Sequence, residues 1–170
     1  MSAVEVEVLF QAAAWSALPD AAALVERAVQ AACDDGAGVG VVLAEGTTIV
    51  VLLTDDAGLR ALNRHWRGKD SATNVLSFPA PEVARAAGEP HLGDIAIAFE
   101  TVEREAAADG KRLADHLTHL GVHGALHLLG YDHEITEDAE AMEALERAVL
   151  ARLGVADPYA DTDPIAETSR

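Results

Sequence analysis

The sequence of 170 residues is poor in cysteine, in basic residues and in aromatic residues. Its single cysteine, Cys33, excludes an intrachain disulfide and with it the cross-linked framework of small secreted proteins, so we expect a reducing, cytoplasmic environment. Only 12 lysines and arginines stand against 29 acidic residues, and a net charge of −17 argues against a protein that wraps the nucleic-acid backbone. The seven aromatic residues are too few for an extended base-stacking platform.

Long hydrophobic runs are also missing. No apolar run approaches the 18 or so residues of a membrane span, and the N-terminus MSAVEVEVLF has two glutamates where a secretory signal has positive charge. We therefore expect no membrane partner. Half of the residues are hydrophobic, which favours a globular fold, and the length favours one domain. We predict a domain over residues 1–155 and an acidic, disordered tail over 156–170.

Acidic and basic residues are unevenly distributed along the chain. Residues 1–54 carry a net charge of −6 and residues 134–170 carry −7, whereas residues 55–133 hold 8 of the 12 basic residues and carry −4. The acidic total therefore describes the two ends better than the middle.

Hydrophobic periodicity predicts an α/β (α+β) fold with a central mixed sheet flanked by helices. Alternating valines predict a strand at 4–8, an alanine-rich helix should run from Pro19-Asp20 to Gly36, and the runs 39–43 and 49–53 resemble a hairpin around Glu45-Gly46. A second helix should run from the Thr54-Asp55 cap to Trp66, followed by a strand at 74–78, an irregular loop at 79–91 and a strand at 94–99. A helical region at 100–129 should be broken at Asp109-Gly110. The last expected helix covers 137–153 and is ended by Gly154; the residues expected on one face of it are Ala141, Leu145, Ala148 and Val149.

Five of the seven histidines fall between residues 116 and 133. His123 and His127 are four apart on a predicted helix, so both imidazoles can reach one ion, and Gly130 can end the helix and return His133 toward it. Three histidine ligands leave a fourth position open, as in a catalytic zinc site. We predict one Zn²⁺ per chain. His119, one turn earlier, is either packed or a hydrogen-bond partner of the ligands.

The ligand spacing H-x-x-x-H-x-x-G-x-x-H also occurs in the metzincin proteases. Those enzymes place a glutamate directly after the first histidine as general base, but this chain has Gly124 there. Peptide hydrolysis is therefore disfavoured.

The segment 123–133, HGALHLLGYDH, resembles the H-G-x-L-H-L-x-G-Y-D-H motif of the YbeY family at every fixed position. The pair Leu62-Asn63 with Trp66-Arg67, the run 73–79, TNVLSFP, and the run 92–95, LGDI, match further family blocks in the same order. The resemblance implies a zincin-like fold, with the metal-binding helix packed on the sheet. It also implies a single-strand-specific zinc endoribonuclease that processes the 3′ end of 16S rRNA and acts in ribosome biogenesis and quality control, with ribosome or small-subunit proteins as partners.

Carried over to this sequence, the resemblance implies that His123, His127 and His133 ligate zinc and that Arg67 is the functional arginine. Arg60, Arg64 and Arg67 are spaced along one helical face that Lys69 extends, and this basic stripe can bind phosphate. We expect Arg67 to stabilise the transition state and Arg60, Arg64 and Lys69 to bind substrate.

Three polar residues within the family-like segments are expected to have structural roles or, for Ser77, either a structural role or an RNA contact. Asp94 is expected at a strand start rather than beside the metal ligands, and Asp132 in the turn rather than as a base. Ser77 has either a buried structural hydroxyl or an RNA contact.

Two alternatives stay open: a metallopeptidase-like hydrolase, and a non-catalytic ribosome assembly factor in which zinc only stabilises the fold.

Overall fold

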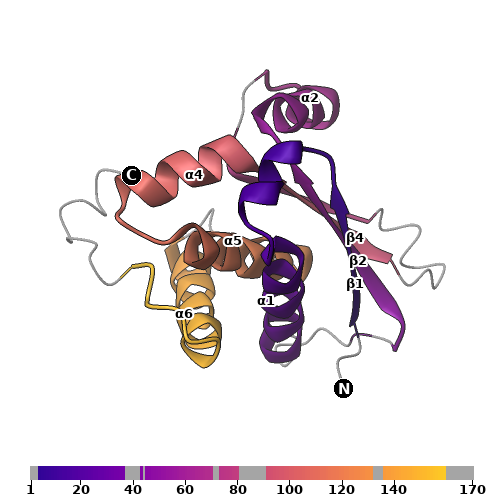
Figure 1. Ribbon diagram of the computed structural model, residues 1–170. Coiled ribbons are helices and arrows are strands. Elements are labelled where there is room, and N and C mark those ends of the chain that lie inside the picture. Colours follow the sequence, from indigo (N-terminus) through magenta and orange to yellow (C-terminus); the bar gives the residue numbers. More distant parts are fainter. Residues whose placement is uncertain are drawn as a thin grey trace.

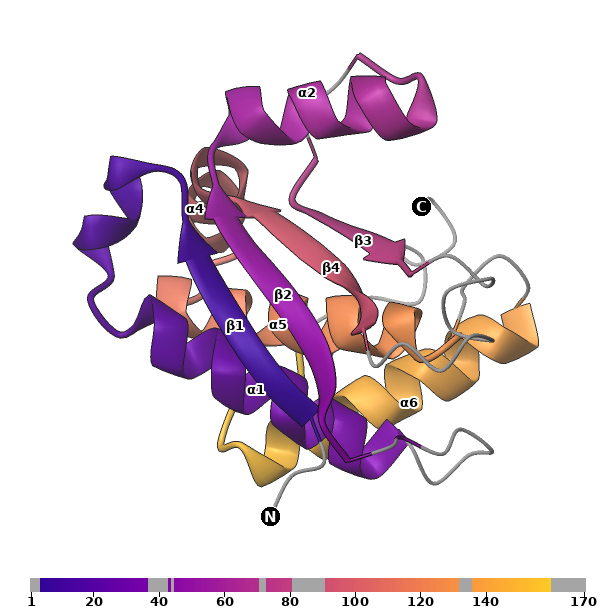
Figure 2. The same cartoon turned by 90° about the vertical axis from the view of Figure 1, so that its right-hand side faces the viewer.

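The computed structural model describes residues 4–36, 43, 45–70, 73–80, 91–131 and 136–159. Its strands form one four-stranded sheet with the order β1-β2-β4-β3 (Figure 2). The strands are β1 (Val4–Phe10), β2 (Thr47–Thr54), β3 (Val75–Pro79) and β4 (His91–Ala98). β1, β2 and β4 are parallel, whereas β3 runs antiparallel to β4 at one edge. The predicted mixed α/β sheet is confirmed.

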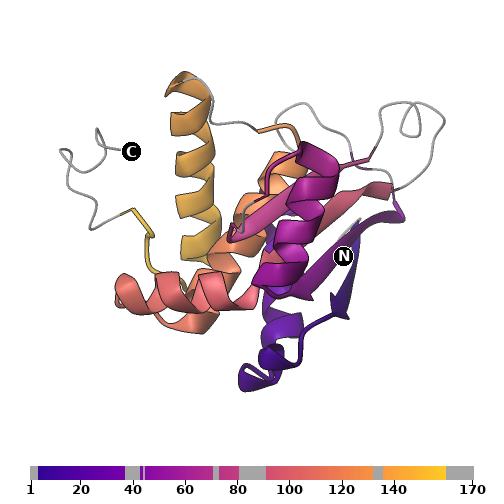
Figure 3. The same ribbon diagram turned by 90° about the horizontal axis from the view of Figure 1, so that it is seen from above.

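Helices lie on both faces of this sheet. They are the 3-10 helix η1 (Ala13–Ala17) and the α-helices α1 (Ala21–Gly36), α2 (Asp56–Arg67), α4 (Phe99–Ala108), α5 (Leu113–Leu128) and α6 (Thr136–Arg152). α1 and α5 pack on one face of the sheet, and α6 packs against both of them, with α5 lying between the sheet and α6 (Figures 1 and 3). α2 lies on the other face (Figure 1).

The alternation of side chains along β4 explains this division. Ile95 and Ile97 are fully buried in the large core beneath α1 and α5. Ala96 and Ala98 point to the other face, where they pack with Leu59 of α2. The small alanines allow α2 to lie close to the sheet, so both faces of β4 are buried.

The helix ends follow the expected local chemistry. Asp55 caps α2, its carboxylate accepting a hydrogen bond of 2.8 Å from the backbone N–H of Gly58. Gly130 follows α5 with φ of 100°, as the sequence predicts. The expected break at Asp109-Gly110 separates α4 from α5, and Gly110 has φ of 66°.

The buried face of α6 agrees with the expected one in part: Val149 is buried and Leu145 packs against the core. Ala141 and Ala148 are exposed. The buried stripe also contains Met142, Glu146 and Leu150, which were not expected there. A charged residue stands in the middle of this stripe, so hydrophobicity alone places only part of the face correctly.

Several expectations fall on residues outside those described. The run 39–43, apart from Leu43, the loop 81–90, and residues 160–170 of the expected tail are among them. Ala156 to Tyr159 are described and lie on the folded body beyond the expected boundary at 155, where Asp157 accepts a hydrogen bond of 3.2 Å from Arg147 Nε. Among the described residues, no helix is both long and apolar enough to span a membrane.

Candidate metal centre

Helix α5 presents four histidines along one side, spaced by three or four residues. The first, His116, is buried, and its Nε2 lies 2.9 Å from Glu105 Oε1 on α4. Burial lowers the pKa of His116 despite the opposing effect of that carboxylate, so the ring is neutral near pH 7. His116 therefore joins α4 to α5.

His123 and His127 have converging side chains. Their Nε2 atoms are 3.1 Å apart. Two nitrogens bound to one tetrahedral zinc ion at 2.0–2.1 Å would be roughly 3.3 Å apart. The observed spacing fits two ligands of one ion, and both side chains come from rigid helical positions one turn apart.

The second ring nitrogen of His123 is already used. His123 Nδ1 lies 2.8 Å from Oε1 of Glu146, a side chain of α6 that is only 1% exposed. Burial alone would raise the pKa of the Glu146 carboxyl, but hydrogen bonds from His119 and His123 and the charges of these histidines lower the pKa well below its ordinary value. An ionised carboxylate only accepts hydrogen bonds, so His123 donates through Nδ1, and in the neutral form of this ring Nε2 has a lone pair for a metal.

His119 binds the other oxygen of the same carboxylate. Its Nε2 lies 2.7 Å from Glu146 Oε2, which also accepts a hydrogen bond of 2.7 Å from the Tyr159 hydroxyl. His119 therefore shares the Glu146 carboxylate with His123. This agrees with the hydrogen-bonding role, one of the two roles expected for His119.

His119, His123 and Glu146 form a possible metal site, because each offers one ligand atom and these atoms lie within 4.8 Å of one another. The two histidine–carboxylate distances of 2.7 and 2.8 Å match hydrogen bonds. His133, the third expected ligand, and the nearby Asp132 lie outside the described residues. The structure thus brings His123 and His127 together, and it adds Glu146 and Tyr159 behind them.

The close packing around Gly124 leaves no room for a larger side chain directly after His123. A Cβ atom built there would lie 2.9 Å from Ile95 Cγ2 on β4 and 3.3 Å from Ser77 Oγ on β3. The carbonyl of Gly124 accepts a hydrogen bond of 3.0 Å from Ser77 Oγ, which gives Ser77 the buried structural role. This side of α5 faces the sheet, and a glutamate has no room at the position where metzincins carry their base.

Arg67 ends α2 and turns toward β3. Its Nη2 donates a hydrogen bond of 2.9 Å to the carbonyl of Ser77, and its guanidinium carbon lies 5.6 Å from the centroid of the Phe78 ring. Since Ser77 in turn binds Gly124, one residue of β3 connects Arg67 to the helix that bears the histidines.

The other two arginines of the basic stripe contact an acidic residue and not β3. Arg60 Nε and Arg64 Nη1 approach the same oxygen of Asp70, at 3.8 and 4.0 Å. All three side chains are exposed, so these contacts hold the arginines only weakly. Lys69 is also exposed.

Asp94 lies on β4 away from these groups. Its Oδ1 lies 2.9 Å from His91 Nε2, and its side chain is 54% exposed. It lies within β4, which begins at His91, and not at the strand start where it was expected.

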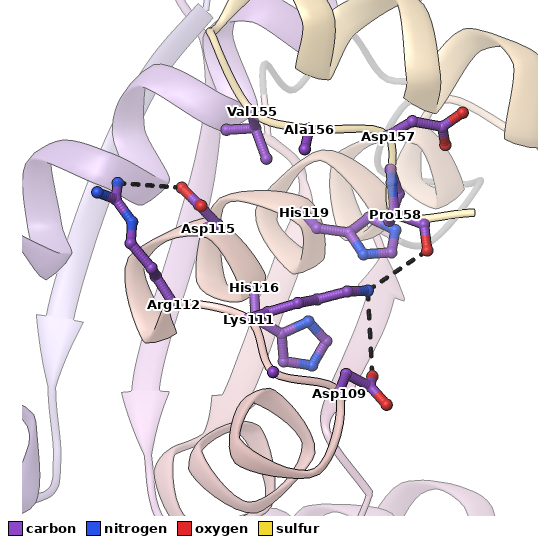
Figure 4. A pocket seen from close by; sticks show the side chains of 11 residues that line it. Asp109, Lys111, Arg112, Asp115, His116, His119, Val155, Ala156, Asp157 and Pro158 are labelled. Atoms are coloured by element: carbon purple, nitrogen blue, oxygen red, sulfur yellow. Dashed lines mark hydrogen bonds and ion pairs between the residues drawn. The ribbon is translucent and has the colours of Figure 1, made fainter. Parts of the chain in front are cut away.

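A cavity of about 260 Å³ adjoins the first turns of α5 (Figure 4). Its wall includes His116, His119 and the segment that follows α6. The Lys111 side chain lies along it, with Nζ 3.4 Å from the Pro158 carbonyl oxygen and 4.0 Å from Asp109 Oδ2 (Figure 4). These contacts attach the segment after α6 to the start of α5, so Tyr159 is held beside Glu146.

Sequence reasoning missed Glu146 and Tyr159. The available signal for Glu146 was its spacing, because it lies four residues after Met142 and three before Val149, on the apolar side of α6. A carboxylate at such a position needs hydrogen-bond donors, which the histidines of α5 supply.

Comparison with known proteins gives a consistent result. A sequence model of the family described as endoribonuclease YbeY matches residues 17–154. A curated protein of that name from Azorhizobium caulinodans is 52% identical over 157 residues, which are 92% of this chain and 97% of the relative. Another, from Rhodopseudomonas palustris, is 54% identical over 160 residues, 92% of this chain and 91% of the relative.

The fold has a counterpart among solved structures. A solution structure of a protein from Thermotoga maritima superposes with a TM-score of 0.52 at 24% identity, covering 94% of this chain and 98% of the other. By its sequence and the extent of these matches, this chain belongs to the endoribonuclease YbeY family.

Proposed function

We propose that this protein is a zinc-dependent endoribonuclease that cleaves single-stranded rRNA, with His123, His127 and His133 as the metal ligands. The observation that carries the proposal is the 3.1 Å approach of His123 Nε2 to His127 Nε2, with His123 Nδ1 bound to Glu146, in a chain whose relatives are named endoribonucleases. Neutral imidazole nitrogens suit zinc among the divalent metals. The two histidines precede Gly130, as a zincin-like arrangement requires.

The protein's own groups would divide the work of phosphodiester cleavage. A zinc ion at this site would supply Lewis-acid polarisation of a phosphoryl oxygen. Arg67 would bind the phosphate and stabilise its developing charge with a planar guanidinium. Arg60, Arg64 and Lys69 would attract the RNA backbone along α2. Each of the four is exposed, so RNA can reach it.

The biological setting we propose is cytoplasmic maturation of the 3′ end of 16S rRNA, with the ribosome or small-subunit proteins as partners. A partner that already holds the RNA suits a chain with a net charge of −17, because such a chain binds polyanions weakly by itself. We also propose one catalytic domain that includes Tyr159, because this residue binds Glu146.

The test compares three substrates with the zinc-loaded protein: a single-stranded RNA, the same RNA in a duplex, and an unstructured protein. We expect internal cleavage of the single strand, little cleavage of the duplex and none of the protein. His127→Ala should lose zinc and cleavage together, whereas His65→Ala, a matched change on α2, should keep one zinc per chain.

Two results would overturn the proposal. Cleavage of the protein substrate would favour the peptidase, which Gly124 disfavours by leaving no room for a base. Bound zinc without cleavage of any RNA would favour an assembly factor in which the metal is structural.

A further inference from the structure

We propose that Glu146 is a positioning residue, which orients His123 so that the Nε2 atom of that histidine faces the metal. This inference rests on the proposed function, since it assumes that His123 is a ligand. It assigns a role in the metal centre to the C-terminal helix α6, which contributes none of the expected ligands.

The hydrogen bonds around Glu146 define the orientation. Oε1 receives His123 Nδ1 at 2.8 Å, and Oε2 receives His119 Nε2 and the Tyr159 hydroxyl, both at 2.7 Å. The carboxylate therefore accepts from three donors that come from two different parts of the chain. A carboxylate that is 1% exposed and bound in this way has little freedom to rotate.

The tautomers of the histidines follow from these contacts. With its proton on Nδ1, neutral His123 has a bare Nε2, and the 3.1 Å contact then requires His127 to donate its Nε2 proton to that atom. For both Nε2 atoms to ligate one metal ion, His127 would have to release this proton, either to its own Nδ1 or to solvent. Without an acceptor at Glu146, the proton of His123 could move to Nε2 and block the ligand atom.

His119 has a different position in the cluster. Its Nδ1 is buried and has no hydrogen-bond partner among the described residues. Its Nε2 is bound to Glu146, and it packs edge-on against the Tyr159 ring at 5.8 Å between centroids. His119 therefore binds one carboxylate oxygen of Glu146 while His123 binds the other.

The direct test is the zinc dissociation constant of Glu146→Gln, measured by competition with a chromophoric chelator. We expect binding that is about 10–100-fold weaker than in the wild type. Glu140→Gln makes the same chemical change at an exposed position of α6 and should leave the constant unchanged. Unchanged affinity in Glu146→Gln, with zinc bound by the wild type, would overturn this inference alone; a wild type that binds no zinc would instead overturn the proposed function.

Two further measurements test the positioning role, and the first of them does not use Glu146→Gln. Nitrogen-15 correlation spectra of the metal-free wild type should show the His123 proton on Nδ1, with the signal assigned by its loss in His123→Gln. Tyr159→Phe should weaken zinc binding by roughly fivefold, because one hydrogen bond to Glu146 is lost, and should add nothing in the Glu146→Gln background. A proton on Nε2 of His123, or fully additive effects, would contradict the positioning role.

Discussion

At the scale of single residues, Gly124 combines a packing role with a chemical one. It lets α5 approach β4 closely at Ile95, and it removes the side chain that a metalloprotease would use as a base at this position. Because Gly124 has no side chain, the helix that bears His123 and His127 packs directly on the sheet. Packing and chemistry are therefore coupled at one position.

Gly124→Ala should lower the free energy of unfolding by about 1–3 kcal/mol, because the added methyl group would lie 2.9 Å from the branched Cγ2 of Ile95. Urea denaturation measures this loss. In an Ile95→Ala background the additional cost of the alanine should nearly disappear, since the atom that it meets is gone. An equal cost in both backgrounds would show that the contact with Ile95 is not the cause.

Arg67→Ala should leave zinc binding intact and slow RNA cleavage by about 10²–10³-fold, because the proposed phosphate ligand is lost while the histidines are untouched. Zinc content and single-turnover cleavage are measured on the same preparation. Arg67→Lys should be intermediate, since lysine keeps the charge but not the planar fork. Full cleavage by Arg67→Ala would disprove the role of Arg67.

At the scale of elements, polar contacts at both ends of α2 add to the packing of Leu59 against the sheet. Arg67 binds β3 at the C-terminal end. At the N-terminal end Asp56 accepts hydrogen bonds of 2.7 Å from the Thr101 hydroxyl and 3.1 Å from Arg104 Nη2, both on α4. These contacts hold the basic side of α2 in place relative to α5.

Asp56→Ala should therefore destabilise the protein by about 1–2 kcal/mol, as expected for the loss of hydrogen bonds to a charged group. Burial by itself would raise the pKa of Asp56, but hydrogen bonds from Thr101 and Arg104 and the charge of Arg104 lower it below 3.8. The contribution is therefore present above pH 3.8 and is lost as the pH falls through the lower pKa of the folded state. Thermal unfolding from pH 7 to pH 2 should show wild type and variant converging in acid; a difference that persists there would assign it to something other than the carboxylate.

Much of the fold was predictable because its signals are local. The valine alternation of β1, the Asp55 cap and Gly130 each depend on neighbouring residues. The contact between His123 and Glu146 spans 23 residues and two helices, and nothing in the local pattern of either helix specifies it. Glu146 also interrupts the apolar stripe of α6, which is why only Leu145 and Val149 of the expected face lie against the core.

At the scale of the whole molecule, the net charge of −17 restricts how RNA is bound. Basic side chains that the RNA backbone can use are concentrated on α2 and the two residues that follow it: Arg60, Arg64, Arg67 and Lys69. These four side chains form a small cationic surface that can bind RNA although the protein as a whole is acidic. The acidic remainder opposes nonspecific adsorption of RNA elsewhere.

The salt dependence of RNA binding measures the size of that surface. If RNA contacts the protein only through these four side chains, a plot of log K against log salt concentration for a single-stranded RNA should have a slope no steeper than about −3. Replacing Arg60 and Arg64 with alanine should reduce the slope, whereas replacing Arg147, which binds Asp157 elsewhere, should leave it unchanged. A much steeper wild-type slope would mean that RNA contacts far more of the protein than α2.

We propose that zinc held by His123, His127 and His133 is required for RNA cleavage. The most direct test removes the metal with a chelator and returns zinc stepwise, recording bound zinc per chain and the rate of cleavage of a single-stranded RNA. The rate should rise in proportion to bound zinc, saturate at one ion per chain, and stay near zero throughout for His127→Ala. Full cleavage by the zinc-free wild type, or by His127→Ala, would contradict it.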